Sequence, residues 1–381
     1  MREILSEIEA WRKEGKQVAI ATNVKRDGSS LRPLGAKMAM TPAQPDPGGT
    51  HRASGVIPEI AGSVTGGCIE GVVYEEAQAV IKNGIPKLLH YGVTSEETPW
   101  EVGLSCGGSL DVFVETMDSP AWREIAPALK TCLEENQLAA VATVISGPGL
   151  GSKMMVWPDG RSLGSLGNAA LDQQAGHWMQ KQIAVQETTW TSFNIAAHHV
   201  AQVEVFVDVF APAARMVVVG AVHIAIPLVT LAKAMGYHTV VIDPRAAFAT
   251  RERFPHVDEL ITEWPSSALE KLRPDEGTYI AVLSHDEKLD NPALALALAS
   301  SARYVGVLGT RKKIPQRFAA LRELGVTDQQ LSRLRAPIGL HLGAIQPEEI
   351  ALSILAEMVT AKHGLPKTQE THVIVPVEVV S

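Results

Sequence analysis

Cysteine is scarce in this chain of 381 residues, which contains only three, far apart from one another. An odd number of widely spaced cysteines does not make a disulfide framework, so a reducing cytoplasm is the simplest compartment. The sequence also has no histidine and cysteine cluster at zinc-ligand spacing, no Walker phosphate loop and no serine nucleophile elbow. The common motifs of zinc domains, P-loop nucleotidases and α/β-hydrolases are therefore absent.

Long apolar runs and blocks of basic residues are missing as well. No stretch reaches 18 uninterrupted apolar residues, so we expect no membrane span, and the amphipathic N-terminal segment with its early glutamate is not a secretory signal. The formal net charge is -8 without a long basic run, which disfavours a nucleic-acid binder. With 46% hydrophobic and 20% charged residues the composition is that of a globular protein, and the length suggests two to three domains.

Residues 1–210 predict an N-terminal α+β domain. The spacing of apolar residues predicts helices at 3–12, 68–83 and 122–134, and strand-like runs occur at 17–24, 36–40, 87–93 and 110–116. Residues 41–54 are rich in glycine and proline and indicate an exposed hairpin loop or an insertion.

A weak internal repeat runs through this domain. Short segments recur in the same order, with an offset that shrinks as deletions in the second copy would require: 18–22 at 139–143, 35–38 at 151–154, 62–64 at 164–166 and 111–115 at 204–208. We interpret the domain as two related halves, at about residues 15–118 and 136–210. Chance similarity between β-rich hairpins is the alternative interpretation.

Residues 211–381 have the pattern of a Rossmann-like, doubly wound parallel sheet. Apolar runs alternate with helix-like segments, and strands that are apolar on both faces indicate a parallel sheet covered on both sides. The predicted strands lie at 215–219, 238–242, 259–261, 279–284 and 304–308. The last helix is predicted at 347–362, where a proline and two acids suit a helix N-terminus.

The turn after the first of these strands partly matches the dinucleotide fingerprint G-x-G-x-x-G/A. Gly220 and Ala225 agree with it, whereas Val222 replaces the middle glycine that lets the backbone approach a pyrophosphate. Asp243 follows the next strand, where an acid would meet a ribose hydroxyl, and His223 is either a phosphate donor or a helix cap. The turn predicts the fold strongly and an NAD site poorly. A Rossmann-like domain without a dinucleotide, or with another phosphate ligand, is the alternative.

A basic segment follows the last predicted parallel strand. Gly309 and Thr310 precede Arg311 and two lysines, and cations beside a helix N-terminus make an anion site. A solvated basic turn is the competing interpretation.

Two loops in the first half are candidates for binding a phosphate or a polar ring. Residues 27–35 combine small hydroxyl residues and glycines with Arg32, and residues 61–68 contain successive glycines whose free backbone N–H groups would form an anion nest. Cys68 then lies at the start of a helix, where the helix dipole lowers the pKa of a thiol.

Two of the three cysteines are flanked by glycine pairs. Cys68 follows one pair and Cys106 precedes another, although either cysteine alone would more often be an inert core residue. The second copy has Asn168 and His199 near the equivalents of these cysteines, so chemistry would belong to the first copy. Cys132 lies in a helical stretch and is interpreted as a core residue.

These segments together resemble the XdhC/CoxI family, accessory proteins of xanthine dehydrogenase and carbon monoxide dehydrogenase. The resemblance spans nearly the whole chain in the family order, with GSSLRPLGAKM at 28–38, GSVTGGCIEG at 62–71, SCGG at 105–108, VVVGAVHIA at 217–225, VIDPR at 241–245, GVLGTRKK at 306–313 and PIGLHLGAIQPEEIALSILAE at 337–357. Two positions depart from the family pattern: Val222 replaces a glycine, and His341 stands where the family usually has an acid. Both weaken a nucleotide site in the C-terminal domain.

The resemblance implies a chaperone for the molybdenum cofactor, which binds molybdopterin, protects it during sulfuration and delivers it. The implied partners are a cysteine desulfurase as sulfur donor and a xanthine dehydrogenase-type apoenzyme. Cys106 first and Cys68 second would ligate molybdenum, because a soft thiolate suits such a metal. The cofactor-binding candidates are Ser29, Ser30, Arg32, Gly35, Lys37, Gly62, Ser63, Gly66, Gly67, Cys68, Cys106, Gly107, Gly108, Gly220, His223, Asp243, Arg245, Gly309 and Arg311.

Three functions are compared on this basis. The leading one is a cofactor-insertion chaperone without turnover of its own, with molybdopterin as cargo in a cleft between the first half and the Rossmann domain. The second is an NAD(P)-dependent oxidoreductase or a subunit of a molybdenum-containing xanthine or carbon monoxide dehydrogenase. The third is a scaffold that only bridges the sulfur donor and the dehydrogenase. We expect a cytoplasmic homodimer that binds neither nucleic acid nor membrane and has no NAD(P).

Overall fold

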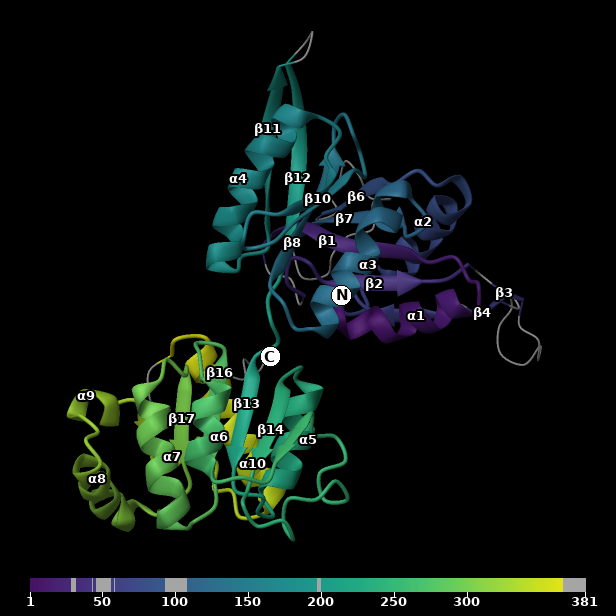
Figure 1. The fold of residues 1–381 in the computed structure, drawn as a ribbon. Helices are drawn as coiled ribbons and strands as arrows, with labels where there is room; N and C mark the ends of the chain where they lie inside the picture. Colours follow the sequence, from purple (N-terminus) through teal and green to yellow (C-terminus); the bar gives the residue numbers. More distant parts are fainter. Residues whose placement is uncertain are drawn as a thin grey trace, which may run out of the picture. The chain divides into compact units, whose positions relative to one another are not determined.

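The structure of the chain, a computed structural model, divides into two compact units, Met1–Pro212 and Ala213–Ser381. It describes residues 1–28, 32–42, 44–45, 56–57, 59–92, 108–196 and 200–365. Each unit has its own hydrophobic core and its own β-sheets (Figure 1).

The first half of the N-terminal unit is an antiparallel sheet with a helix on one face. The strand order is β5-β2-β1-β7-β6. The strands are β1 (Ala19–Asp27), β2 (Lys37–Met40), β5 (Ile60–Gly62), β6 (Lys87–Tyr91) and β7 (Ser109–Thr116). Helix α2 (Glu70–Asn83) buries Val73, Ala77 and Val80 against one face, where every second strand residue is apolar. The N-terminal helices η1 (Arg2–Ile4) and α1 (Leu5–Lys13) pack their apolar residues against the opposite face.

The second half repeats this arrangement strand for strand, with the order β10-β9-β8-β12-β11 and helix α4 on one face (Figure 1). Its elements are β8 (Ala139–Ser146), β9 (Lys153–Val156), β10 (Ser162–Ser165), α4 (Ala169–Val185), β11 (Thr189–Ala196) and β12 (Val200–Phe210), and α3 (Pro120–Glu134) joins the halves. Thr22 pairs with Lys37 in the first sheet, and Thr143 pairs with Lys153 in the second. The predicted internal repeat is therefore present in the fold.

The two sheets face each other across a shared core. Val24, Phe113, Ile145 and Phe206 form a small apolar cluster there. Val24 and Ile145 lie at equivalent irregularities of the strand pairing, between Asn23 and Lys25 in β1 and opposite Glu204 and Val205 in β8. Such a bulge re-aims the side chain that it carries, here toward the opposing sheet.

Two buried ion pairs cross this interface reciprocally. The Lys37 Nζ atom lies 2.6 Å from Asp208 Oδ2 of the second half, and Lys153 Nζ lies 2.7 Å from Glu115 Oε1 of the first half. Both lysine side chains are almost wholly buried, at 4% and 1% exposure. Burial lowers the pKa of Lys153, and the Glu115 carboxylate offsets part of that effect. Each half thus supplies the counter-ion that the other half needs.

The C-terminal unit is a parallel six-stranded sheet in the order β15-β14-β13-β16-β17-β18. Numbered along the chain, this order is 3-2-1-4-5-6, the Rossmann arrangement. The strands are β13 (Arg215–Val219), β14 (His238–Ile242), β15 (Glu259–Ile261), β16 (Thr278–Val282), β17 (Tyr304–Val307) and β18 (Leu334–Arg335). The predicted class, an N-terminal α+β domain followed by a Rossmann-like parallel sheet, is confirmed.

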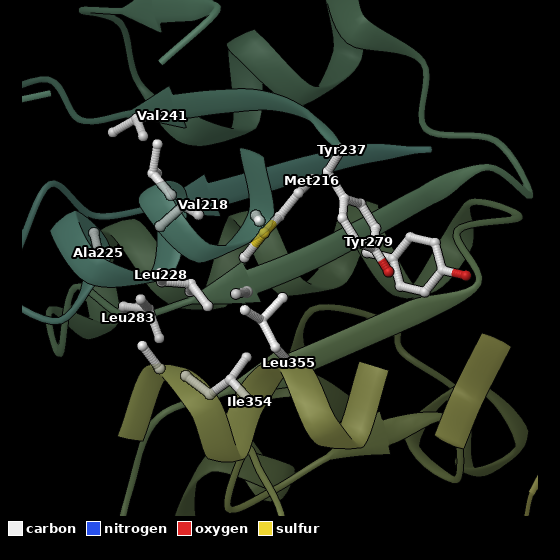
Figure 2. Close-up of a cluster of buried hydrophobic side chains, with 14 of the residues drawn as sticks. Met216, Val218, Ala225, Leu228, Tyr237, Val241, Tyr279, Leu283, Ile354 and Leu355 are labelled. Carbon is white, nitrogen blue, oxygen red and sulfur yellow. The ribbon is translucent and has the colours of Figure 1, made fainter. Parts of the chain in front are cut away.

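Helices cover both faces of this sheet. On one face α5 (Ala225–Ala234) and α10 (Pro347–Lys362) bury Leu228, Ile354 and Leu355 against Met216 and Val218 (Figure 2). The other face is covered by α6 (Pro265–Leu272), α7 (Glu287–Ala299) and α8 (Ile314–Glu323), with η2 (Arg311–Lys313) and α9 (Asp328–Leu331) in the same region of the chain. Strands buried on both faces explain the continuous apolar runs of the sequence.

The predicted element ends differ from the observed ones by a few residues. The first strand, predicted at 17–24, runs from Ala19 to Asp27, and the helix predicted at 68–83 begins at Glu70. A short hairpin of β3 (Gln44–Pro45) and β4 (Val56–Ile57) lies where a hairpin loop or insertion was expected; residues 43 and 46–55 lie outside the described residues. In the described part of the chain, no helix combines the length and the apolar character that a bilayer span requires.

We predict that removing one partner of a reciprocal pair destabilises the N-terminal unit. Lys153→Met leaves the Glu115 carboxylate buried and unpaired, which should cost about 3–5 kcal/mol of unfolding free energy. The double variant Lys153→Met, Glu115→Met should recover most of the loss because no uncompensated charge remains. Urea unfolding of the intact chain, followed by tryptophan fluorescence, measures this, since six of the seven tryptophans precede residue 213.

An exposed ion pair provides the matched control. Lys87 and Glu76 lie 2.7 Å apart with side chains that are 53% and 33% exposed. Lys87→Met should therefore change the unfolding free energy by less than about 1 kcal/mol. Equal effects of Lys153→Met and Lys87→Met would contradict a structural role for the buried pair.

Candidate functional site

The two candidate loops of the first half and the segment that contains Cys106 all connect strand ends at one edge of the sheet. The pairing places the end of β1, the start of β2, the end of β5, the end of β6 and the start of β7 together, because neighbouring strands are antiparallel. Residues 28–36, 63–69 and 92–108 connect these ends. Ser29, Ser30, Cys106 and Gly107 lie outside the described residues, while Gly108 is buried immediately before β7. The topology therefore gathers predicted site residues that are distant in the sequence.

The same edge of the second half carries much shorter connections. There residues 147–152, 166–168 and 197–199 take the places of the three first-half loops. Because the two sheets have the same strand order, this difference is confined to the loops. Binding residues concentrate on loops that a rigid scaffold positions. The edge of the first half, which carries the longer loops, is therefore the candidate site.

The carboxylate of Glu70 fills the backbone nest that the sequence predicted to be free. It accepts hydrogen bonds from the N–H groups of Thr65, Gly66, Gly67 and Ile69 at 2.9–3.2 Å, and from the hydroxyls of Thr65 and Ser63. The prediction that these N–H groups are free for a ligand anion is therefore wrong. Burial raises the pKa of Glu70, but the hydrogen bonds from Ser63, Thr65 and Gly66 outweigh it and lower the pKa to about 2.

Cys68 lies on the outer, exposed side of this loop. Gly66 and Gly67 have φ angles of 100° and 126°, which lie outside the helical region, so α2 begins two residues after Cys68 rather than at it. In the second half Asn168 caps the N–H groups of Ala170 and Leu171, and α4 begins at Ala169. Replacing that first helical turn with Gly-Gly-Cys is what exposes the thiol.

The repeat fixes which residues correspond at this loop. Ser63 bonds Glu70, and Ser165 bonds Asp172 through the equivalent side chains, so both pairs are offset by 102 residues. Asn168 therefore matches Gly66, and Ala170 rather than Asn168 matches Cys68. Cys132 is buried, as predicted, and its Sγ atom accepts a hydrogen bond from Trp157 Nε1 at 3.1 Å.

Of the candidates at the first loop, Lys37 faces the interior rather than the edge. Its ammonium is buried against Asp208, and a side chain at Gly35 would collide with the same carboxylate, at 2.9 Å from Oδ1. Both residues serve the contact between the halves, which corrects their assignment to cofactor binding. Arg32 lies at the loop and is paired with Glu3 Oε1 at 2.5 Å. Similarly, Gly62 at φ 75° is required where its Cβ would meet the Lys37 carbonyl oxygen at 2.3 Å.

In the C-terminal unit, Asp243 is turned toward the protein. It is wholly buried, and it accepts the Ala221 N–H at 2.8 Å and three hydrogen bonds from Arg245. Burial raises the pKa of Asp243, but the bonds from Arg245 and Ala221 outweigh it, so the pKa lies below its usual value. Its carboxylate holds the Gly220 turn instead of facing a ribose, which corrects the expected role.

Other residues of the Gly220 turn also make structural contacts. A Cβ at Gly220 would come within 2.7 Å of the Ser284 backbone, so only glycine allows this approach between the ends of β13 and β16. The Val222 side chain packs against the core cluster on the α5 face, and His223 is exposed before α5. Gly309 and Arg311 follow β17, where Arg311 is exposed.

Metal ligands do not cluster in the described residues. There, no three histidine, cysteine, aspartate or glutamate side chains lie close enough together to hold an ion. Cys68 is the candidate metal ligand within the described residues, and Cys106 falls outside them. The site can thus offer one exposed thiol, glycine backbone without side chains, and a loop held rigid from beneath by Glu70.

Family models match both units of the chain. Residues 11–92 and 132–194 match the model described as the XdhC and CoxI family, and residues 216–358 match the model described as the XdhC Rossmann domain. The chain belongs to the XdhC and CoxI family. The first of these matches reaches both halves of the repeat, and it includes the Glu70 loop and Cys68.

Individual relatives are similar in sequence over most of the chain. It is 24% identical over 93% of its length to a Bacillus subtilis protein named as a probable subunit of xanthine dehydrogenase, which is covered to 96%. It is 26% identical over 91% of its length to the Escherichia coli molybdenum cofactor insertion chaperone PaoD, which is covered to 84%. A crystal structure of a Bacillus halodurans protein described as a xanthine dehydrogenase has a TM-score of 0.72 at 23% identity, covering 97% of this chain and 98% of that one. This last likeness shows a shared fold.

Sequence reasoning missed Glu70, although a signal for it was present. An acid stands seven residues after a serine in both copies of the repeat, as Ser63 with Glu70 and Ser165 with Asp172. Reading the repeat for shared polar residues, rather than for shared apolar segments, would have found it.

We predict that Glu70→Gln loosens the loop and increases the reactivity of Cys68. The amide keeps the size of the side chain but loses the charge and half of the acceptor capacity that four N–H groups use. The rate of iodoacetamide modification of Cys68, followed by peptide mass spectrometry on the intact protein, should rise severalfold. Asp172→Asn, the same change at the equivalent position of the second half, should leave the rate unaltered. An unchanged rate in Glu70→Gln would show that the carboxylate does not hold the loop.

Proposed function

We propose that the chain is an accessory chaperone that binds molybdopterin, supports its sulfuration and inserts it into a xanthine dehydrogenase-type apoenzyme. Membership of the XdhC and CoxI family supports this, as does the similarity to a relative named a molybdenum cofactor insertion chaperone. The proposed partners are that apoenzyme and a cysteine desulfurase as sulfur donor. A homodimer and a cytoplasmic location stay predictions of the sequence.

The observation that carries the proposal is the elaborated edge of the first half. Three connecting segments begin and end there, the equivalent segments of the second half contain fewer residues, and one of the three exposes Cys68 beside two glycines. A Cβ built on Gly67 would meet no atom within 4 Å, so the outer side of the loop is open. A flat ligand can therefore approach the backbone closely while a soft thiolate reaches its metal.

Glu70 gives this edge its rigidity. Because its carboxylate satisfies the inward N–H groups, the loop keeps its shape without a ligand, and less ordering entropy is lost when cargo binds. A carrier also has to release its cargo, and a single thiol on a rigid loop provides a contact that a receiving enzyme could displace. The loop would bind the cargo, and the buried ion pairs would stabilise the two sheets that carry the loop.

We expect the two glycine-flanked cysteines to contribute to metal retention. Protein purified from cells that make molybdopterin should carry pterin, measured by its fluorescence after oxidation, together with molybdenum, measured by mass spectrometry. Cys106→Ser should lower the molybdenum content most and Cys68→Ser second, each severalfold. Cys132→Ser is the matched control, because that thiol is buried in the core beside Trp157.

Two outcomes would decide against parts of this proposal. If Cys106→Ser and Cys68→Ser keep as much molybdenum as Cys132→Ser, neither thiol is a ligand. If the unaltered protein carries neither pterin nor molybdenum but still binds the dehydrogenase, the chain is a scaffold rather than a cargo carrier.

The strand order of the C-terminal sheet favours one other function, an NAD(P)-dependent oxidoreductase. The acid that would bind a ribose is instead engaged by Ala221 and Arg245. We therefore predict no saturable binding of NADH or NADPH in a fluorescence titration, either by the unaltered chain or by Val222→Gly. The glycine would open the turn without releasing Asp243. Saturable binding by the unaltered chain would restore the oxidoreductase alternative.

A further inference from the structure

A pocket lies at the carboxyl edge of the C-terminal sheet, outside the Gly220 turn. Its lining comes from the last residue of β17, from the segments that follow β16, β17 and β18, including η2, and from the N-terminal parts of α7 and α8. None of its lining residues belongs to residues 220–225. Ligands of open α/β sheets bind at this edge, because loops and helix N-termini converge there.

The pocket has an apolar wall. Val307 ends β17 and Leu308 follows it, Pro337 follows β18, and Ile314 and Phe318 come from α8. Phe318 also packs against the core cluster beneath, which restrains its ring. A restrained aromatic side chain beside aliphatic ones suits a flat ring.

Near the start of α8 the lining of the pocket is polar and positively charged. Lys313, Thr310 and Arg317 line the pocket there. Among the described residues Lys313 has no ion-pair partner, no side chain caps α8, and the first turn of this helix carries no acid. Neighbouring α7 differs, since Asp286 caps it by accepting the Lys288 N–H at 3.0 Å. The N–H groups and dipole at the start of α8 and the Lys313 cation immediately before it therefore combine in one place that attracts an anion.

Arg317 is held in position from behind. Its Nη1 atom lies 3.3 Å from Asp290 Oδ2 and 3.2 Å from Asn291 Oδ1, and its side chain is only 13% exposed. The Asp290 carboxylate is itself buried and accepts the Ser284 hydroxyl. A guanidinium fixed in this way needs little reorganisation to meet a ligand.

We propose that this pocket binds a phosphorylated aromatic heterocycle. The ring lies along Phe318 and Ile314, and the phosphate meets Lys313, the Thr310 hydroxyl and the start of α8. Glu287, an exposed acid in the lining, accepts a hydrogen bond from an amino group of the ring. The phosphate end of a pterin and a nucleoside monophosphate share this chemistry. For the pterin, the assignment rests on the function proposed above.

Calorimetric titration of the full chain tests the assignment with four probes: a 6-hydroxymethylpterin monophosphate, adenosine monophosphate, 6-hydroxymethylpterin and inorganic phosphate. We expect one ring phosphate to bind with saturation, and the ring or phosphate alone to bind at least tenfold more weakly. The ring phosphate that binds more tightly identifies the source of the ligand. Lys313→Glu should weaken its binding at least about tenfold, as the loss of a charge-assisted hydrogen bond and the added repulsion require.

Lys312→Glu is the matched control, because it makes the same charge change one residue away, outside the pocket lining. It should change the affinity less than about threefold, as expected for a screened surface charge. Thr310→Val, which removes one hydroxyl and no charge, should lower the affinity for the ring phosphate and leave the affinity for the unphosphorylated ring unchanged.

The assignment is overturned if neither ring phosphate binds, if the unphosphorylated ring binds equally well, or if Lys312→Glu and Lys313→Glu weaken binding equally. None of these outcomes removes the proposed chaperone function, which is judged by the pterin and molybdenum in the purified protein. Conversely, the purified chain could carry no pterin or molybdenum and still bind adenosine monophosphate in a way that depends on Lys313. That result would support the pocket and contradict the chaperone function.

Discussion

The reciprocal burial of two lysines fixes the N-terminal unit. Among the described residues, the carboxylate that pairs with Lys37 is Asp208 of the other half, and the one that pairs with Lys153 is Glu115 across the same interface. A buried ammonium without its carboxylate is costly, so neither inner face is stable alone. A strand slip of one residue would also turn each lysine onto the helix-covered face. The pairs therefore set both the strand register and the contact between sheets, and the position of every loop at the edge follows.

With the scaffold fixed in this way, the two halves differ where it matters for binding. The shared serine and acid brace the start of the helix in each copy, as Ser63 with Glu70 and Ser165 with Asp172. In the second copy the helix begins at Ala169, directly after its Asn168 cap. In the first copy two glycines occupy the equivalent positions, so the helix begins only at Glu70 and Cys68 is exposed. A duplicated fold thus keeps one copy for structure and gives the other an exposed thiol. This division accords with membership of the XdhC and CoxI family and with the proposed cargo role.

The C-terminal unit shows how a binding fold can keep its shape while its usual contacts change. Gly220 remains necessary, but the reason lies in its close approach to Ser284. Asp243 remains at the end of β14, yet it braces the turn together with Arg245. The carboxyl edge still offers a pocket, now between the ends of β16–β18 and α8, where cations and an aromatic wall meet. A fingerprint motif can therefore report a fold without reporting its ligand.

The sequence alone determined the fold class, the internal repeat, five of the six described C-terminal strands and the core position of Cys132, because burial imposes regular apolar spacing on neighbouring residues. The two-residue strand β18 is too short to show such a pattern. It also singled out the glycine-rich loops. Only the tertiary structure decided what those residues contact: that Glu70 fills its own loop, that Lys37 faces Asp208 and that Asp243 faces Ala221. Each of these depends on polar partners that the folded backbone brings together, from 1 to 171 residues apart in the chain. Periodicity reports which side of an element is buried, but it carries no information about which charge lies opposite.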